Sequence, residues 1–376
     1  MFLYFLLLIS FLDTMAQLPI LVLYINHLHA TAIMTGVIMA SYSLSNLVAN
    51  IFNGYISDIY GRKIAIIAGM IIAGTAVIFY GLINTPNQLL FVRIIHGLGG
   101  GILVPAIFAL IGDIHKKGSV GKSMGYSGAA VGLAALLGPM LAGIGKDALG
   151  FSTFFIFLGS LIVVTAILAI FLLPYDKKSE TKVELNFNII RNLFLDKRLQ
   201  IGYISALGVT FSQGALAFQL PLHLQSLGYA TKYVGLFLSL FAFTAIIIFL
   251  SPISRRSDRR GRLTPIKAGY VFLMASFMTL LFSNSSPLFM ISMIFFGLGF
   301  GLIFPAMNAV IVDNADPLYR GSAFGIFYAV FSLGIVIGQF LSGVALELSI
   351  SPYLVTFLAN LIVLITLSIK TVKVKV

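Results

Sequence analysis

Apolar runs of about twenty residues or more follow one another along almost the whole of this 376-residue chain. Hydrophobic residues make up 59% of the sequence, charged residues make up 10%, and the mean hydropathy is +1.04. A water-soluble fold cannot bury that much apolar surface, whereas a helix of about 20 apolar residues crosses the hydrocarbon of a bilayer. A transmembrane barrel would instead show alternating segments of about ten residues. The sequence therefore predicts an all-α polytopic membrane protein.

Charges, prolines and polar clusters divide the apolar sequence into twelve transmembrane helices. Their predicted bounds are roughly 2–25, 32–55, 62–83, 88–111, 119–145, 151–173, 200–226, 232–252, 264–283, 287–310, 320–346 and 351–370. We expect two pseudo-symmetric six-helix bundles, over 1–173 and 200–376, joined by a charged cytoplasmic linker over 174–199. Within the linker, 185–195 has the pattern of an amphipathic helix that lies along the membrane surface.

The distribution of positive charge predicts the orientation in the membrane. The net charge is +12, and all of the 24 Lys and Arg residues except Arg93, Lys146 and Lys232 fall on one side of the predicted spans. By the positive-inside rule, we expect both termini and the linker to lie in the cytoplasm. We expect the chain to be a multi-pass protein of the plasma membrane. Because these cations lie in short loops, they do not indicate nucleic acid. The chain has no cysteine, which excludes disulfides and Cys-ligated metal, and we expect no metal site.

A charged loop, G-Y-I-S-D-I-Y-G-R-K at 54–63, lies between the second and third spans and returns as S-R-R-S-D-R-R-G-R-L at 254–263. The same offset of 200 residues relates H-G-L-G-G-G-I-L-V-P-A at 96–106 to F-G-L-G-F-G-L-I-F-P-A at 296–306. A register held this long indicates two related halves, the architecture of alternating-access transporters. The glycine string lacks the strand and the lysine of a nucleotide site, so it predicts close helix packing.

The repeated loop suggests a latch that closes the cytoplasmic side of the protein. An acid in the loop could accept hydrogen bonds from a helix N-terminus, and an arginine could pair with an acid at the end of the fourth or tenth span. In the alternative interpretation, the cations only keep the loop in the cytoplasm, which explains neither the acids nor the glycines. The latch residues are Gly54, Asp58, Gly61, Arg62, Lys63 and Asp113 in the first half, and Asp258, Gly261, Arg262 and Asp313 in the second.

Asp13 lies near the middle of the first predicted span. A charged residue there costs about 2.5–3.5 kcal/mol on insertion scales, so intramembrane acids usually face a cavity and carry a function. Burial disfavours the charged form of a carboxylic acid, which makes Asp13 a candidate for carrying or gating a coupling proton. The alternative is a structural acid paired with Arg93, the one cation inside a span. The repeat places the neutral Gln213 at the equivalent position.

Arg93 and His96 lie one turn apart in the fourth span and are candidates for the same proton-coupling site. Arg93 could instead extend to the outer interface of the membrane, as long cationic side chains do. His96 is either a proton relay or a hydrogen-bonded core residue.

Together, these features resemble the major facilitator superfamily over the whole chain. The loop at 54–63 matches the family's G-x-x-x-D-x-x-G-R-K motif, and the copy departs from it at Ser254 and Leu263. Arg93 followed by Gly97 resembles the R-x-x-q-G motif of proton-driven members, with His96 at the usual Gln position. The resemblance implies alternating access between two helical bundles.

The fifth span resembles the antiporter motif g-x8-G-x3-G-P-x-x-G-G, which implies the twelve-span drug:proton antiporter group of exporters. The matching residues are Gly125, Gly138, Pro139 and Gly143, while Ala134 and Ala142 replace two glycines. Gly138 and Pro139 also predict a bending point in this helix.

Polar or aromatic residues at span centres are candidates for lining a substrate cavity, although each alone could be an interhelical hydrogen bond. They are Gln17, Tyr42, Asn46, Tyr126, Gln213, Gln219, Asn308, Tyr328 and Gln339. With 33 Phe residues and few polar groups, such a cavity favours an amphipathic or lipophilic substrate, cations included.

The sequence predicts a secondary active transporter, not an enzyme, that exports small molecules against inward proton flow. The proton is the coupling ion, no other cofactor is expected, and we expect a monomer in the lipid bilayer. Two alternatives stay open: a proton-coupled symporter that imports a small nutrient, and a membrane receptor or scaffold that transports nothing.

Overall fold

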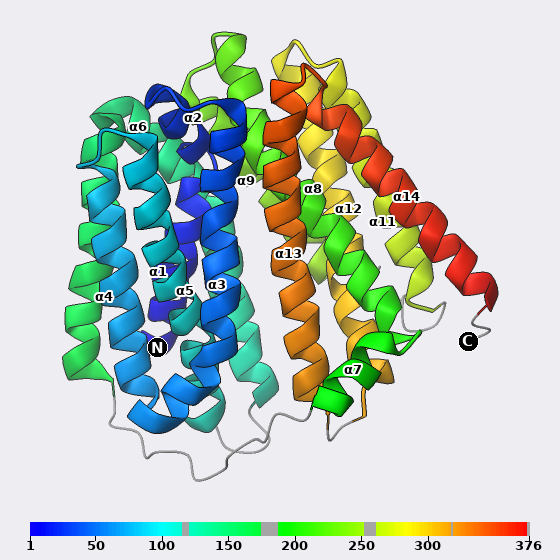
Figure 1. Cartoon of the computed structure of the whole chain (residues 1–376), viewed down its shortest axis with the longest axis horizontal. Coiled ribbons are helices and arrows are strands. Elements are labelled where there is room, and N and C mark those ends of the chain that lie inside the picture. The colour runs from blue at the N-terminus through cyan, green and yellow to red at the C-terminus, as the bar shows by residue number, and fades with distance from the viewer. Residues whose placement is uncertain (115–119, 174–186, 252–260, 317–318, 374–376) are drawn as a thin grey trace. The chain divides into compact units, whose positions relative to one another are not determined.

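The computed structural model describes residues 1–114, 120–173, 187–251, 261–316 and 319–373, and contains no strand within them. Side chains are described for these residues except 51–60, 112–114, 120–125, 187–188, 320–321 and 371–373. The helices are α1 (Phe2–Gln17), α2 (Leu21–His27), α3 (Ala32–Tyr60), α4 (Arg62–Tyr80), α5 (Pro86–Ile114), α6 (Val120–Leu172), α7 (Phe187–Leu195), α8 (Leu199–Ser226), α9 (Thr231–Leu250), α11 (Leu263–Leu281), α12 (Ser286–Asn314), α13 (Arg320–Glu347) and α14 (Pro352–Lys373). The all-α prediction is confirmed (Figure 1).

The helix lengths agree with the predicted spans. Ten helices of the described chain are long and apolar enough to cross a membrane, and the pair α1 and α2, bent by 46°, meets the same criteria when taken together as one broken span. Pro19, which has no backbone N–H to donate, lies in the break between them. With 53 residues, α6 is too long for one crossing, and the non-helical backbone of Gly150 (φ 76°, ψ 173°) divides it into two, as the sequence predicted.

Two pairs of corresponding helices in the two sequence halves have the same lengths. Both α4 and α11 have 19 residues, and both α5 and α12 have 29, with starts offset by about 200 residues. Gly61 (φ 88°) and Gly261 (φ 84°) precede α4 and α11 in the left-handed region that glycine adopts without strain. The repeat therefore extends from sequence to local backbone geometry.

Glycines bring α4 against α5 and α11 against α12. A Cβ on Gly99 would lie 2.8 Å from the backbone nitrogen of Ala73, and one on Gly69 would lie 2.9 Å from the Gly99 carbonyl oxygen. Gly269 and Gly299 oppose each other in the same way in the second half. Since even one methyl group does not fit, the glycine string is a close-packing device, as predicted.

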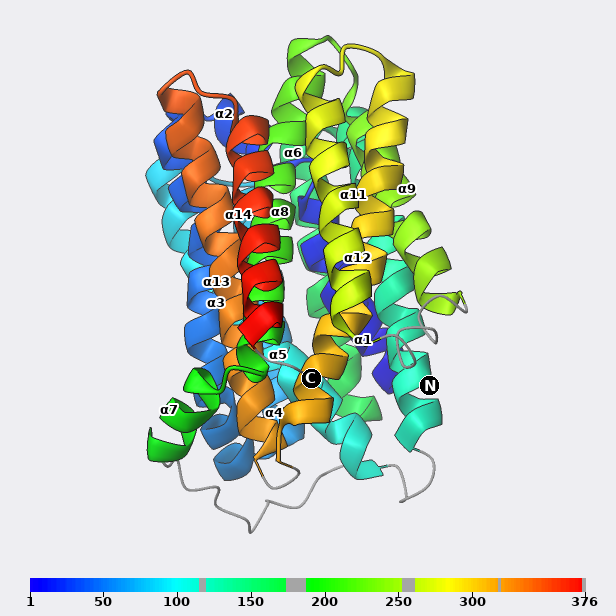
Figure 2. The ribbon, with the colours of Figure 1, turned by 90° about the vertical axis from the view of Figure 1, so that its right-hand side faces the viewer.

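Contacts divide the chain into two compact units. The first comprises Met1–Val183 with Pro221–Ser239, and the second comprises Glu184–Leu220 with Leu240–Val376. In the first unit, α1 packs on α6, and α5 packs on α3 and α4 (Figure 1). In the second unit, α11 packs on α12 and α14, and α7 packs on α13 (Figure 2). The predicted amphipathic segment is thus helical, while its position on a membrane surface and the predicted domain bounds stay predictions.

Candidate functional site

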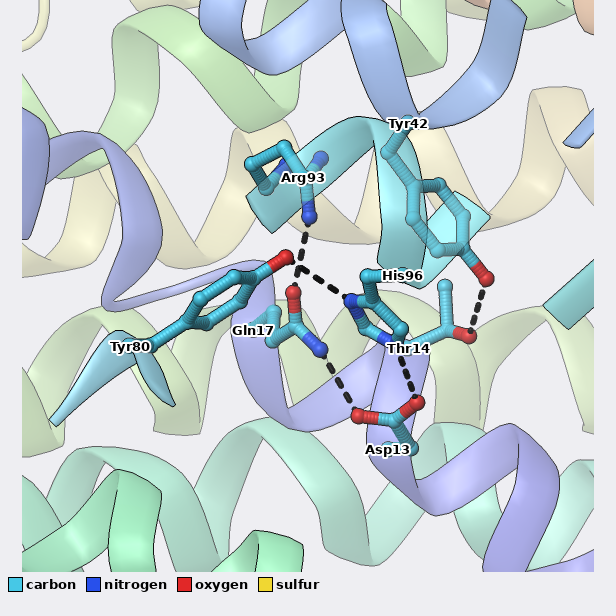
Figure 3. Close-up of polar contacts among 7 residues, drawn as sticks. All are labelled: Asp13, Thr14, Gln17, Tyr42, Tyr80, Arg93 and His96. Carbon is cyan, nitrogen blue, oxygen red and sulfur yellow. Dashed lines mark hydrogen bonds and ion pairs between the residues drawn. The ribbon is translucent and has the colours of Figure 1, made fainter. Parts of the chain in front are cut away.

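The predicted acid of the first span, Asp13, is buried in the first unit with both carboxylate oxygens engaged. Its side chain is on α1, and the residue is 5% exposed. Gln17 lies one helical turn further on the same face of α1 and donates its Nε2 to Asp13 Oδ1 at 2.7 Å. His96 Nε2, on α5, lies 2.8 Å from Asp13 Oδ2 (Figure 3). A carboxylate held by two partners away from water is stabilised in a defined orientation.

The predicted buried cation, Arg93, belongs to the same cluster. It is 4% exposed and donates from Nη1 to Gln17 Oε1 at 2.8 Å. Its Nη2 and Nε donate to the carbonyl oxygens of Met39 and Ile38 on α3, at 3.1 and 3.4 Å. The guanidinium thus turns inward to α1 and α3, rather than outward to the membrane interface.

Gln17 therefore stands between the acid and the cation. Sequence reasoning placed Gln17 in a substrate cavity, but the residue is 4% exposed and its amide bridges Arg93 to Asp13. The predicted pairing of Asp13 with Arg93 is thus mediated by an amide that accepts from one and donates to the other. The i, i+4 spacing of Asp13 and Gln17 was the available signal for this link.

His96 is fully buried and joins the acid to a tyrosine that the sequence reasoning missed. The hydroxyl of Tyr80, on α4, lies 2.8 Å from His96 Nδ1, and Tyr80 is also fully buried (Figure 3). Tyr24 on α2 donates its hydroxyl to the Tyr80 backbone oxygen at 2.5 Å. Tyr80 is the last residue of α4, and nothing in the sequence indicates this role. Only the packing of α4 on α5 brings Tyr80 to His96.

Tyr42 on α3 covers the other side of the cluster. Its ring lies 4.8 Å from Arg93 Cζ and, edge to face, 4.8 Å from the ring of His96. The Tyr42 hydroxyl is 3.5 Å from Thr14 Oγ1 (Figure 3). Tyr42 is half-buried, so it connects the closed cluster to less buried surroundings.

The remaining cavity candidates are spread over both units. Asn46 accepts from Asn50 at 2.8 Å, and Asn308 donates to the Phe304 carbonyl at 2.8 Å. Tyr126 and Tyr328 are exposed and contact other aromatic rings. The Oε1 atoms of three further candidates are buried without a hydrogen-bond partner among the described residues: Gln213, Gln219 and Gln339. The structure thus brings Tyr42 and Gln17 to the cluster around Asp13, places Asn46 beside Tyr42, and places the other candidates elsewhere.

One pair of the predicted latch is visible in the second unit. Arg262 Nε donates to Asp313 Oδ2 at 2.9 Å, in a partly exposed ion pair that joins the start of α11 to the end of α12. In the first unit, Lys63 donates to the carbonyl oxygen of Leu173 at 2.8 Å. The side chains of Gly54, Asp58 and Asp113, and all of Asp258, lie outside the described residues.

Gly138 allows close helix packing in α6. A Cβ at this position would lie 2.8 Å from Met15 Cβ, so α1 approaches α6 closely beside Asp13. The helix continues through Pro139, and the backbone leaves helical geometry at Gly150 instead. The packing at Gly138 thereby contributes to the position of α1 in the cluster.

The chain is similar in sequence to known membrane proteins. A family model described as Major Facilitator Superfamily matches residues 3–339 and 202–374. The chain is 23% identical to Multidrug resistance protein 2 of Bacillus subtilis, over 92% of this chain and 88% of that protein. It is 26% identical to the Quinolone resistance protein NorA of Staphylococcus aureus, over 93% and 90%. An uncharacterised MFS-type transporter of Methanocaldococcus jannaschii is 27% identical, over 85% and 84%.

Solved structures show the same fold. The nucleoside transporter NupG superposes with a TM-score of 0.82 at 14% identity, covering 98% of both chains. A POT family transporter superposes with a TM-score of 0.81 at 13% identity, covering 99% of this chain and 95% of that one. With the family model matching nearly the whole sequence and the fold shared, the protein is a member of the major facilitator superfamily, a family of membrane transporters.

Proposed function

We propose that this transporter is a proton-coupled antiporter that exports small amphipathic or lipophilic molecules, cations included, from the cytoplasm. The observation that carries the proposal is the buried cluster in which Asp13 contacts His96 directly and Arg93 through Gln17. An acid this deep in a span has to be compensated, and here its partners are a titratable imidazole and a bridged cation. Such a set can bind and release one proton without exposing a bare charge to lipid.

The proposed coupling of proton to substrate follows from the contacts that connect Asp13 to Tyr42. A proton bound at Asp13 and His96 removes the negative charge that Gln17 and Arg93 face, and so changes the balance of charge beside the Tyr42 ring. Tyr42 is half-buried, so a substrate that contacts it, above all a cation, competes electrostatically with Arg93 and with the proton. Antiport requires this mutual exclusion, because proton and substrate must not travel together in one direction.

The relatives support the choice of an exporter. Two of them carry the names Multidrug resistance protein 2 and Quinolone resistance protein NorA, and both align with more than nine tenths of this chain. The many Phe residues and the neutral Gln213 opposite Asp13 in the repeat fit an amphipathic substrate better than a polyanion. The loop charges support the further proposal that both termini and the Arg262–Asp313 pair lie on the cytoplasmic side of the plasma membrane.

Proteoliposomes with an imposed proton gradient test the proposal. We expect ethidium and tetraphenylphosphonium to accumulate in the acidic compartment and to evoke proton release, and we expect Asp13→Asn to abolish both. Glu347→Gln, which neutralises an exposed acid at the end of α13, is the matched control and should behave like the wild type.

Three outcomes would contradict the proposal. Substrate-evoked proton release that survives Asp13→Asn would remove Asp13 from the coupling site. Accumulation in the alkaline compartment would indicate symport, and the absence of coupled flux with every cation would favour a receptor or scaffold.

A further inference from the structure

The hydrogen bonds that connect Arg93 through Gln17 to Asp13 allow only one assignment of donors and acceptors. A guanidinium only donates, so Gln17 must present Oε1 to Arg93 and its NH2 group to Asp13 Oδ1. Oδ1 is therefore an acceptor, and a proton placed on it would oppose the Gln17 amide. The amide orientation is assigned from this network, and turning it over would lose both hydrogen bonds.

A proton can therefore enter the cluster only between Asp13 Oδ2 and His96. Before the proton is bound, Asp13 is a carboxylate and His96 is neutral, with its hydrogen on Nε2 directed to Oδ2. His96 Nδ1 is then an acceptor, and the Tyr80 hydroxyl 2.8 Å away donates to it. Every group in this series of hydrogen bonds, which runs from Tyr80 through His96, Asp13 and Gln17 to Arg93, then has a donor or an acceptor of the correct type.

Binding one proton reverses the hydrogen bond between His96 and Tyr80, wherever in the pair the proton resides. The proton resides either on His96, as an imidazolium beside the Asp13 carboxylate, or on Asp13 Oδ2, with neutral His96 carrying its hydrogen on Nδ1. In both forms Nδ1 bears a hydrogen, and the net charge of the pair rises by one unit, from −1 to 0. The Nδ1 hydrogen needs an acceptor, and the Tyr80 oxygen occupies that position.

We infer that Tyr80 is the positioning residue of the coupling proton: its hydroxyl donates to His96 in the unloaded site and accepts from His96 in the loaded site. The inference deepens the proposed function and rests on it, because the proton of this pair is a coupling proton only if the protein is a proton-coupled transporter. Among the described residues, the groups around His96 leave no substitute. They are Asp13 on α1, Tyr42 presenting its ring from α3, and Arg93, which donates to Gln17 and also faces the Tyr80 hydroxyl. The apolar Phe155 of α6 packs against Tyr80.

The surroundings of Tyr80 hold the hydroxyl in place for both tasks. The side chain is fully buried, and its backbone oxygen is bound by the Tyr24 hydroxyl. Because water is excluded, a phenylalanine at this position would leave Nδ1 without a partner in both states. With the proton on His96, the loaded state would lose more, since the imidazolium is charged and a hydrogen bond to a charged group is worth roughly twice a neutral one.

The test is a pH titration of the purified protein in lipid nanodiscs by infrared difference spectroscopy, which needs no substrate. The signal that disappears in Asp13→Asn identifies the proton of the pair. In Tyr80→Phe we expect the midpoint of this signal to move to lower pH by about one unit. Tyr270→Phe is the control, because Tyr270 is equally buried and its hydroxyl bonds to backbone groups, donating to the Ser205 carbonyl oxygen at 2.8 Å. The midpoint in this variant should stay unchanged.

A second variant keeps the shape of the side chain in case Tyr80→Phe does not fold. Tyr80→3-fluorotyrosine makes the hydroxyl a better donor and a poorer acceptor, so the midpoint should move in the same direction by a smaller amount. Wild-type midpoints in whichever of these variants fold would overturn the role of Tyr80. The proposed function fails separately, if Asp13→Asn leaves coupled transport intact in proteoliposomes.

Discussion

Removing the amide of Gln17 tests whether it is the link between Asp13 and Arg93. Gln17→Met keeps the length and volume of an unbranched side chain and deletes two hydrogen bonds to charged groups. In soluble proteins each such bond is worth about 1.5–3 kcal/mol. Interhelical hydrogen bonds in membranes average about 0.6 kcal/mol with a maximum near 1.7, because the unfolded state in the membrane also finds partners.

The expected loss of stability lies between these two scales. Both charged groups are almost fully buried, and each keeps other partners, Asp13 its histidine and Arg93 two carbonyl oxygens. We therefore expect Gln17→Met to lower the free energy of unfolding by about 2–3 kcal/mol. Reversible unfolding in mixed micelles, followed by circular dichroism, measures this difference.

Gln339 provides a matched control for this experiment. It is also a buried glutamine on a membrane helix, 6% exposed against 4% for Gln17, but its Oε1 has no partner among the described residues. Gln339→Met should therefore change the stability by less than about 0.5 kcal/mol or raise it. If Gln17→Met is no more destabilising than Gln339→Met, the bridge has no energetic role.

A double-mutant cycle then separates the two bonds of the bridge. In the Asp13→Asn background, the bond that Gln17→Met removes at position 13 is a bond to a neutral partner. The effect of Gln17→Met on the free energy of unfolding should therefore shrink by about 1 kcal/mol. Strictly additive effects of the two substitutions would show that Gln17 stabilises the helix packing independently of the acid.

Two further predictions concern helix packing and the charged loop. Gly99→Ala should destabilise the protein by about 1–3 kcal/mol, because the new methyl group would lie 2.8 Å from a backbone nitrogen of α4, whereas Gly128→Ala, with no atom within 4 Å, should be neutral or stabilising in the same unfolding assay. Arg262→Gln should slow substrate efflux with normal membrane insertion and have little further effect in an Asp313→Asn background, since the two residues form one ion pair; equal slowing in both backgrounds would contradict a shared role.

Some site residues could be found from the sequence because their types are unusual for their surroundings. An acid, a histidine and an arginine in the first and fourth spans of a chain with 10% charged residues are candidates wherever they finally pack. What this reasoning could not supply was the connection between them. The sequence did not decide whether Arg93 extends to the membrane interface or pairs with Asp13, and it assigned Gln17 to a substrate cavity.

The sequence by itself determined the class of the protein, its spans and its internal repeat. Apolar runs leave a chain no stable alternative to helices in lipid, and the glycines at a fixed offset specify which helix faces can approach closely. Only the tertiary structure decided how the buried polar groups pair. Asp13, Tyr80 and His96 come from three helices, and the packing of α1 and α4 on α5 brings their side chains within hydrogen-bonding distance. In a medium without water, that packing leaves each of these groups only the partners that neighbouring helices present, so the three-dimensional arrangement, rather than residue type, determines how they pair.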